Sequence, residues 1–227
     1  MNEKPQKKRS GRRKRRLHIL ITAGPTREYF DSVRFISNPS SGKMGYAIAE
    51  AAANAGHRVT LVSGPVSLDP PKHVRTIHVE TAAEMATAAK RAFASADAAI
   101  FVAAVCDYRP QRRAARKTAK QAKPKSIALV PTEDIAAALG KVKRRRITVA
   151  FAMEDHAARA HAEAKLRRKN CDAIVLNGPE NVGSDSASVE FLTRDSRWEH
   201  WPAASKSRVA GRLVRQLERL AAQRAGA

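Results

Sequence analysis

The stretch VRFISNPSSGKMG (33–45) carries the residues best suited to bind phosphate. It follows an apolar segment with a glycine turn (18–28) and runs into an alanine-rich segment. A glycine- and serine-rich loop at the start of a helix attracts anions, because free backbone N–H groups and the helix dipole face the ligand. The groups offered by this loop are Asn38, Ser40, Ser41, Gly42 and Lys43. We therefore expect a phosphorylated substrate or a nucleotide here.

Two common nucleotide-binding motifs are incomplete in this loop. The Walker A motif needs a glycine five positions before Gly42 and a serine or threonine after Lys43. The chain has Ser37 and Met44 at those positions, so the magnesium-binding hydroxyl is absent and a P-loop nucleoside triphosphatase is excluded. The dinucleotide fingerprint G-x-G-x-x-G is present only in its second half. Taken alone, Gly45 is more typical of a helix packed closely on a sheet.

Apolar strands alternate with helices along the chain, and this alternation predicts the framework that holds the loop. Near-continuous apolar segments are typical of strands buried on both faces of a sheet. Such strands are predicted at residues 17–23, 58–65, 74–79, 97–105, 127–130, 147–155 and 171–177. Helices are predicted at residues 43–55, 81–95, from about 132, at 156–170 and at 205–222. The pattern predicts an α/β fold, with a doubly wound, mostly parallel Rossmann-like sheet and helices on both faces.

Local signals indicate where some elements end and where the site lies. Thr81 and Glu84 form a capping box, and Thr132 is expected to cap the helix that follows it. Residues 188–201 are predicted to form a short hairpin. Ligands of such sheets bind beyond the carboxyl ends of the strands. The polar segments that fall at these ends are GPTRE, CDYRP, AMED and LNGPEN.

The net charge of +22 is concentrated in four segments. Residues 1–16 hold nine Lys/Arg, 109–125 hold eight, 141–146 hold five and 165–169 hold four, and the rest of the chain is slightly acidic. Local clusters suit binding sites for polyanions better than a uniform coat does. We expect residues 1–16 to be a disordered basic tail, residues 17–227 a single domain, and residues 109–125 a mobile basic loop.

Several classes of protein are disfavoured by composition. No apolar run approaches the ~20 residues that span a bilayer, and no signal-peptide pattern is present. Cys106 and Cys171 form neither a zinc spacing nor a disulfide framework, which fits a reducing cytoplasm. The sequence identifies no metal ligands.

The sequence disfavours two other functions. A nicotinamide-dependent oxidoreductase of the short-chain type needs a Tyr-x-x-x-Lys pair. Tyr29, Tyr46 and Tyr108 are each followed four positions later by a residue other than lysine. A nucleic-acid-binding protein would interleave aromatic residues with its basic segments, whereas aromatic content is only 5%. Weak, salt-sensitive binding of nucleic acid through residues 1–16 remains as a side property.

A set of motifs, in order, resembles one enzyme family. ITAGPTRE, VRFISNPSSGKMG, VTLVSGPVSL, AAVCDYRP, a Lys-rich stretch and KLRRKNCDAIVLN look like phosphopantothenoylcysteine synthetase, the CoaB half of the bifunctional coenzyme A biosynthesis flavoprotein. The resemblance covers about residues 17–220. It implies a homodimeric ligase that uses CTP with Mg²⁺, 4′-phosphopantothenate and L-cysteine. An acyl cytidylate forms first, and the cysteine amine then displaces CMP. We expect a stand-alone ligase without FMN, served by a separate decarboxylase.

The resemblance also implies roles for individual residues. Lys117 matches the mobile-loop lysine of the first step, and Asn38 matches the asparagine that turns the acyl cytidylate into product. Asp107 matches an acidic residue of nucleotide recognition, while the backbone near Ala103 and Ala104 completes base reading. Further nucleotide- and substrate-binding positions are Ser40, Ser41, Gly42, Lys43, Lys120, Thr132, Glu133, Asp134, Ile135, Phe151, Lys165 and Lys169. Capping of the helix after them would explain Ser40 and Ser41 almost as well.

Three segments depart from the family pattern. In KTAK, Ala119 stands where the family has a lysine, which leaves Lys120. Thr132-Glu133 replaces the usual Asn-Pro or Thr-Pro. VGSDSA (182–187) lacks an aromatic residue and an amide of the corresponding family segment. These departures leave the proposed chemical groups in place and bear on the details of nucleotide contact.

Overall fold

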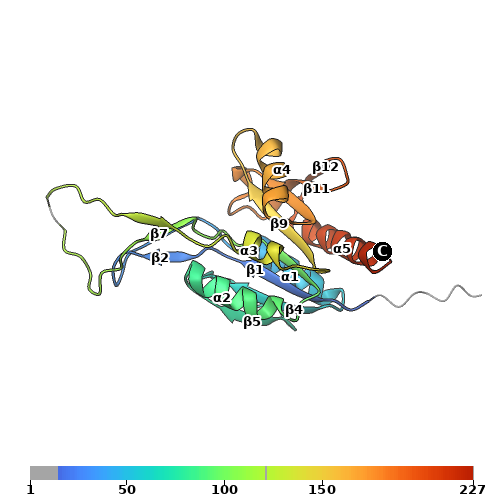
Figure 1. Ribbon diagram of the computed structural model, residues 1–227, viewed down its shortest axis with the longest axis horizontal. Helices are drawn as coiled ribbons and strands as arrows, with labels where there is room; N and C mark the ends of the chain where they lie inside the picture. Colours follow the sequence, from blue (N-terminus) through green and yellow to red (C-terminus); the bar gives the residue numbers. More distant parts are fainter. Residues whose placement is uncertain (1–14, 121, 227) are drawn as a thin grey trace, which may run out of the picture.

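A computed structural model describes residues 15–120 and 122–226 of the chain, which are built around one eight-stranded sheet (Figure 1). The strand order is β12-β11-β10-β9-β6-β1-β4-β5. The strands are β1 (His18–Ala23), β4 (Arg58–Ser63), β5 (Arg75–His78), β6 (Ala98–Phe101), β9 (Ile147–Met153), β10 (Ala173–Asn177), β11 (Ser186–Thr193) and β12 (Glu199–Ser205). Neighbours from β5 to β10 pair in parallel, and β11 and β12 add an antiparallel edge.

Helices cover both faces of the sheet. They are α1 (Lys43–Asn54), α2 (Ala82–Phe93), α3 (Ile135–Lys141), α4 (Ala158–Arg168) and α5 (Lys206–Ala225). Alternate residues of β1 explain the two layers, since Ile19 and Ile21 share a core cluster with α1 and α5 whereas Leu20 packs with α2 and α3. The α4 helix packs on β9 and β10. The predicted doubly wound α/β class is confirmed.

Two short ribbons lie outside the main sheet. One is β2 (Arg27–Tyr29) with β3 (Phe35–Ser37), in a region predicted only as loop. The other is β7 (Tyr108–Pro110) with β8 (Leu129–Pro131). The prediction that residues 127–130 resume the main sheet was therefore wrong. Leu129 is 46% exposed, and a strand of three residues flanked by basic chain has too little apolar surface for the sheet interior.

The ends of the helices agree in part with the sequence. The capping box at Thr81 and Glu84 is present. The predicted cap at Thr132 was wrong, because Asp134 caps α3 by accepting a hydrogen bond from the Ala137 amide at 3.0 Å. The Thr132 hydroxyl instead donates to the Cys106 carbonyl oxygen at 2.5 Å. No helix of the described chain is long and apolar enough to cross a membrane.

The predicted disordered tail concerns residues 1–14, which lie outside the described residues, and Arg15 and Arg16, which are described. Arg15 donates to Asp97 at 3.0 Å, and Leu17, directly after the tail, is buried. The mobility expected of residues 109–125 stays a prediction.

Gly45 sets how closely α1 lies on the sheet. A Cβ atom at this position would stand 2.4 Å from the Cβ of Ala23, the last residue of β1. That separation is far inside van der Waals contact, so the first turn of α1 rests directly on the carboxyl end of β1. The interpretation of Gly45 as a packing residue is confirmed.

Replacing Gly45 by alanine is therefore expected to destabilise the protein by about 1–3 kcal/mol, the usual penalty of overpacking. Gly211→Ala is the matched control: it lies inside α5, and its added Cβ would meet nothing closer than the Arg215 side chain at 3.6 Å. We expect the control to stabilise the protein by about 0.5–1 kcal/mol, since alanine favours helix. Urea unfolding at one protein concentration measures both, and equal midpoints for the two variants would contradict the packing role.

Candidate active site

A cavity of about 760 Å³ lies at the carboxyl ends of β1, β6, β9 and β10. Fifteen of the seventeen residues singled out from the sequence line it. These are Asn38, Ser40, Ser41, Gly42, Lys43, Ala103, Ala104, Asp107, Thr132, Glu133, Asp134, Ile135, Phe151, Lys165 and Lys169. Segments far apart in the sequence converge here because the carboxyl ends of parallel strands share one edge of the sheet. The roles assigned to these residues stay predictions.

The first turn of α1 offers uncapped backbone N–H groups to this cavity. Gly42 is the N-cap residue at φ 75°, and no side chain accepts a hydrogen bond in a capping arrangement. Capping is thus not the function of Ser40 and Ser41; the Ser40 hydroxyl accepts only a 3.4 Å bond from the Gly42 amide. The first turn also holds no acidic residue. The arrangement favours an anion at the start of α1.

Each of three lysines at the cavity is held by a carboxylate. The Lys43 ammonium lies 2.6 Å from Asp185. Lys165 lies 2.5 Å from Glu154, and Lys169 lies 3.1 Å from Asp134. The ion pairs hold the three cations close to the cavity and partly neutralise them, so an incoming phosphate competes with the carboxylates for each ammonium.

The Asp134 carboxylate is stabilised in its ionised form by its neighbours. Burial alone would raise the pKa of its carboxyl group, but the Ala137 amide, Lys169 and Arg168 outweigh burial and lower the pKa. Asp134 therefore remains ionised and fixes both the start of α3 and the position of the Lys169 ammonium.

Asn38 and Asp107 differ in how their side chains are engaged. The Asn38 amide nitrogen donates to the carbonyl oxygens of Ala104 at 3.0 Å and Val105 at 3.2 Å. These hydrogen bonds connect the loop before α1 to the segment that follows β6. The Asp107 carboxylate has no hydrogen-bond or ion-pair partner within residues 15–120 and 122–226. It is exposed and borders the cavity, so it is free to accept hydrogen bonds from a ligand.

Lys117 and Lys120 do not line the cavity. They lie on the chain between β7 and β8, residues 111–120 and 122–128, here called the arm, which projects away from the sheet (Figure 1). Its first half is fastened beside the turn between β2 and β3. There the buried Asp31 carboxylate accepts from the Thr118 amide at 3.1 Å and from the Arg34 guanidinium. Lys117 is thus held at that turn.

Several cavity residues were missed from the sequence. They include Lys206 and Arg168, together with Tyr108 and Asn181, which were not singled out although they lie in the polar segments CDYRP and LNGPEN. Lys206 is only 8% exposed, and its ammonium donates to the Asn181 carbonyl oxygen at 3.2 Å. Burial, and then the nearby Lys43 charge, lower its pKa. No local sequence pattern predicts that a lysine at the start of the last helix lines the cavity, because the β11–β12 hairpin brings it there.

The described residues contain no group of three or more His, Cys, Asp or Glu side chains placed to hold a metal ion. Of the cavity carboxylates, Glu133 and Asp134 are each paired with a basic residue. Asp107 is the carboxylate left available.

Comparison with other proteins identifies the family. A family model described as the C-terminal domain of the DNA/pantothenate metabolism flavoprotein (DFP) matches residues 14–220. The chain belongs to the DFP family. This confirms the resemblance found in the sequence.

Relatives of this DFP domain include CoaBC, the coenzyme A biosynthesis bifunctional protein of Bacillus subtilis, which is 40% identical over 211 residues. The alignment covers 91% of this chain and 52% of the relative. A prokaryotic protein named cysteine/cysteine sulfinic acid decarboxylase, of unknown organism, is 41% identical over 205 residues, which cover 88% of this chain and 57% of that protein. The chain thus spans about half the length of the curated relatives it matches.

A crystal structure of the C-terminal domain of CoaBC has the same DFP fold. Its TM-score is 0.79 at 41% identity, and the match covers 90% of this chain and 95% of the crystallised chain. The likeness therefore extends over nearly the whole of that domain.

The arm of this DFP domain is expected to loosen when its Asp31 anchor is weakened. In Asp31→Asn, an amide replaces the carboxylate that accepts from Arg34 and Thr118, so trypsin should cleave within the arm severalfold faster, with cut sites mapped by mass spectrometry. Asp195→Asn, on an exposed turn, is the control. Equal cleavage in both variants would rule out this anchor.

The pH dependence of the same anchor has a defined sign. Burial would raise the pKa of Asp31, but Arg34 and three backbone amides overcome it and hold the pKa well below its usual value. The anchor is then complete above the unfolded-state pKa of about 3.9 and is lost only as the pH falls through the lower folded value. Hydrogen exchange of the Thr118 amide should therefore show the same protection factor at pH 5 and pH 7.

Proposed function

We propose that this chain is the ligase that joins 4′-phosphopantothenate to L-cysteine in coenzyme A biosynthesis, consuming CTP. The observation that carries the proposal is the convergence of the uncapped start of α1 with the ammonium groups of Lys43, Lys165 and Lys169 on one cavity. Membership of the DFP family and likeness to the C-terminal domain of CoaBC support the same reaction.

In the first step, a carboxylate oxygen of 4′-phosphopantothenate attacks the α-phosphorus of CTP. A bond forms between that oxygen and phosphorus, and the α–β phosphoanhydride bond breaks to release pyrophosphate. Two anions must approach each other, so cations must offset their repulsion and the charge that develops on pyrophosphate. Lys165 and Lys169 offset it at the cavity. Lys117 joins them only after the arm leaves the turn at Asp31 and closes over the nucleotide.

In the second step, the cysteine amine attacks the acyl carbon, CMP leaves, and the amine loses a proton as the amide forms. Asn38 is proposed to donate a hydrogen bond to the acyl oxygen without adding negative charge. Its amide nitrogen donates to the carbonyls of Ala104 and Val105. One of these bonds is exchanged for the acyl oxygen when the intermediate forms.

Mg²⁺ fits the cavity as a companion of the nucleotide. Magnesium usually binds through one or two carboxylates together with substrate phosphates and waters. Asp107 supplies one free carboxylate at the cavity edge. Bound there with the triphosphate, the ion would neutralise part of the phosphate charge.

We propose that the chain works as a homodimer in the cytoplasm, with a phosphopantothenoylcysteine decarboxylase acting in the same pathway. Large apolar side chains are exposed where the β2–β3 and β7–β8 ribbons adjoin, and such patches mark interaction surfaces. They are Val33, Phe35, Ile36, Tyr108, Ile127 and Leu129. A second copy of the chain would cover them, and the two buried free cysteines fit a reducing compartment.

The dimer is tested by placing a charge on this surface. Leu129→Asp should shift the sedimentation coefficient from dimer to monomer at micromolar concentration, because the carboxylate would be buried unpaired. Val142→Asp, also at an exposed apolar residue but outside the surface, should leave the dimer unchanged. A monomeric sedimentation coefficient for the unsubstituted protein would contradict the proposed homodimer.

The reaction is tested by measuring pyrophosphate release with 4′-phosphopantothenate and either CTP or ATP, before and after cysteine is added. We expect release with CTP before cysteine, and CMP with the amide product only after it. Release of CO₂ from cysteine or cysteine sulfinate, with no nucleotide consumed, would favour the activity named in the decarboxylase relative instead.

Variants separate the two steps. In Lys117→Ala the intermediate should barely form, with pyrophosphate release reduced about 10²-fold or more, as for loss of one electrostatic group. In Asn38→Ala release should continue while acyl cytidylate accumulates. Lys125→Ala, on the same arm, is the control. Equal residual turnover in the Asn38 and Lys117 variants would remove the assignment of roles.

A further inference from the structure

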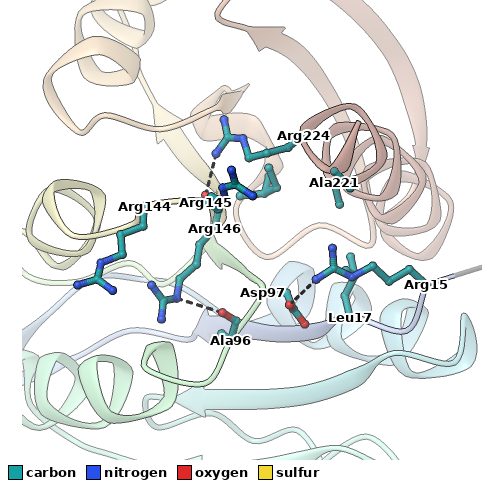
Figure 2. Close-up of a pocket in the computed structure, with 11 residues that line it drawn as sticks. Arg15, Leu17, Ala96, Asp97, Arg144, Arg145, Arg146, Ala221 and Arg224 are labelled. Atoms are coloured by element: carbon teal, nitrogen blue, oxygen red, sulfur yellow. Dashed lines mark hydrogen bonds and ion pairs between the residues drawn. The ribbon is translucent and has the colours of Figure 1, made fainter. Parts of the chain in front are cut away.

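A second cavity, of about 570 Å³, lies at the amino ends of β1, β6 and β9, the opposite edge of the sheet from the candidate active site (Figure 2). It is lined by Arg15, Leu17, Ala96, Asp97, Arg144, Arg145, Arg146, Ile147, Ala221, Arg224 and Ala225. Arg15 therefore lies here beside Arg144, Arg145 and Arg146 of the basic segment 141–146, and none of these residues has a part in the proposed ligase reaction.

The cavity carries a large excess of positive charge. Five arginines from three separate parts of the chain face a single carboxylate, Asp97. That carboxylate is already engaged, since it accepts from the Arg15 guanidinium at 3.0 Å and from the His18 amide at 2.8 Å. Arg224 is paired with Asp172, which does not line the cavity, so the unbalanced charge within the described residues is that of Arg144, Arg145 and Arg146.

Two of the arginines are positioned by the fold. The Arg146 guanidinium donates to the carbonyl oxygens of Ala94 and Ala96 at 2.8 and 3.1 Å. Arg224 donates to Asp172 at 2.7 Å. It also donates to the Arg146 carbonyl oxygen at 3.1 Å (Figure 2). These groups have lost most of their side-chain freedom before any ligand arrives, which lowers the entropic cost of binding.

Two other arginines are unengaged. Arg144 and Arg145 have no hydrogen-bond or ion-pair partner within the described part of the chain, and both are exposed. Arg144 has φ 51°, in the left-handed region that residues other than glycine seldom adopt. The turn before β9 therefore presents two adjacent free guanidinium groups beside the two that are fixed.

We propose that this cavity binds a small molecule that carries two or more phosphate groups. Guanidinium groups match phosphate oxygens in bidentate geometry. Leu17, Ile147 and Ala221 provide an apolar wall for the rest of the ligand. Because the whole sheet separates this cavity from the candidate active site, its ligand acts as an effector or a stabiliser and not as a substrate.

A nucleic acid fits these observations less well. Strands of nucleic acid are bound along extended basic grooves with aromatic side chains for base stacking. The arginines here surround a hollow, and none of the residues that line it is aromatic.

The probe is inorganic triphosphate, titrated calorimetrically into the full chain carrying Lys165→Met and Lys169→Met, so that binding at the candidate active site is suppressed. Adding Arg144→Ala and Arg145→Ala should weaken the affinity about tenfold or more, the effect of losing charge-assisted hydrogen bonds. Arg215→Ala with Arg219→Ala removes the same charge from the exposed face of α5 and should change the affinity less than twofold.

A further variant tests the cavity without touching the arginine turn. Ala221→Glu places a carboxylate on the apolar wall and should weaken triphosphate binding by a similar factor, with an unchanged thermal midpoint as the check on folding. The proposal is overturned if triphosphate does not bind, if both arginine pairs have equal effects, or if an oligonucleotide binds through Arg144 and Arg145 while triphosphate does not.

Discussion

The close approach of α1 to β1 is the contact on which the site depends. Because Gly45 has no side chain, the first turn of the helix rests on Ala23 at the very end of the strand. The uncapped N–H groups of that turn therefore lie at the carboxyl edge of the sheet, beside the chains that leave β6, β9 and β10. A bulkier residue would move the helix start and its partial positive charge away from the other polar groups.

Paired charges give the cavity its second property. Lys43, Lys165 and Lys169 each have a carboxylate partner at 2.5–3.1 Å. Without such partners, several ammonium groups around one hollow would repel one another and remain mobile. The carboxylates fix the cations in place at the cost of part of their attraction for phosphate. A ligand with several negative charges can interact with several ammonium groups at once and so offset the weakened ion pairs. A singly charged anion gains little, so the arrangement favours polyphosphates.

Features determined by neighbouring residues, or by the edge rule of parallel sheets, were predictable from the sequence. The capping box at Thr81, the alternation of strands and helices, and the convergence of polar strand ends all belong to this group. The pairing of β8 with β7 was not predictable, since its short apolar run also suits a strand of the main sheet. Lys206 reaches the cavity only through the fold-back of the β11–β12 hairpin, which no local pattern encodes.

Two clusters of basic residues lie at opposite edges of the sheet. Lys165 and Lys169 lie at the carboxyl edge, where the helix start already attracts anions, and Arg144 and Arg145 lie at the amino edge, where no helix start contributes. At the carboxyl edge both the backbone N–H groups of the helix start and the carboxylate-paired lysines attract anions. At the amino edge the side chains alone must supply the charge, which accounts for the choice of arginine, with its fixed fork of donors. The two proposed phosphate sites thus rely on different physical means, and a substitution at one edge is expected to leave the other intact.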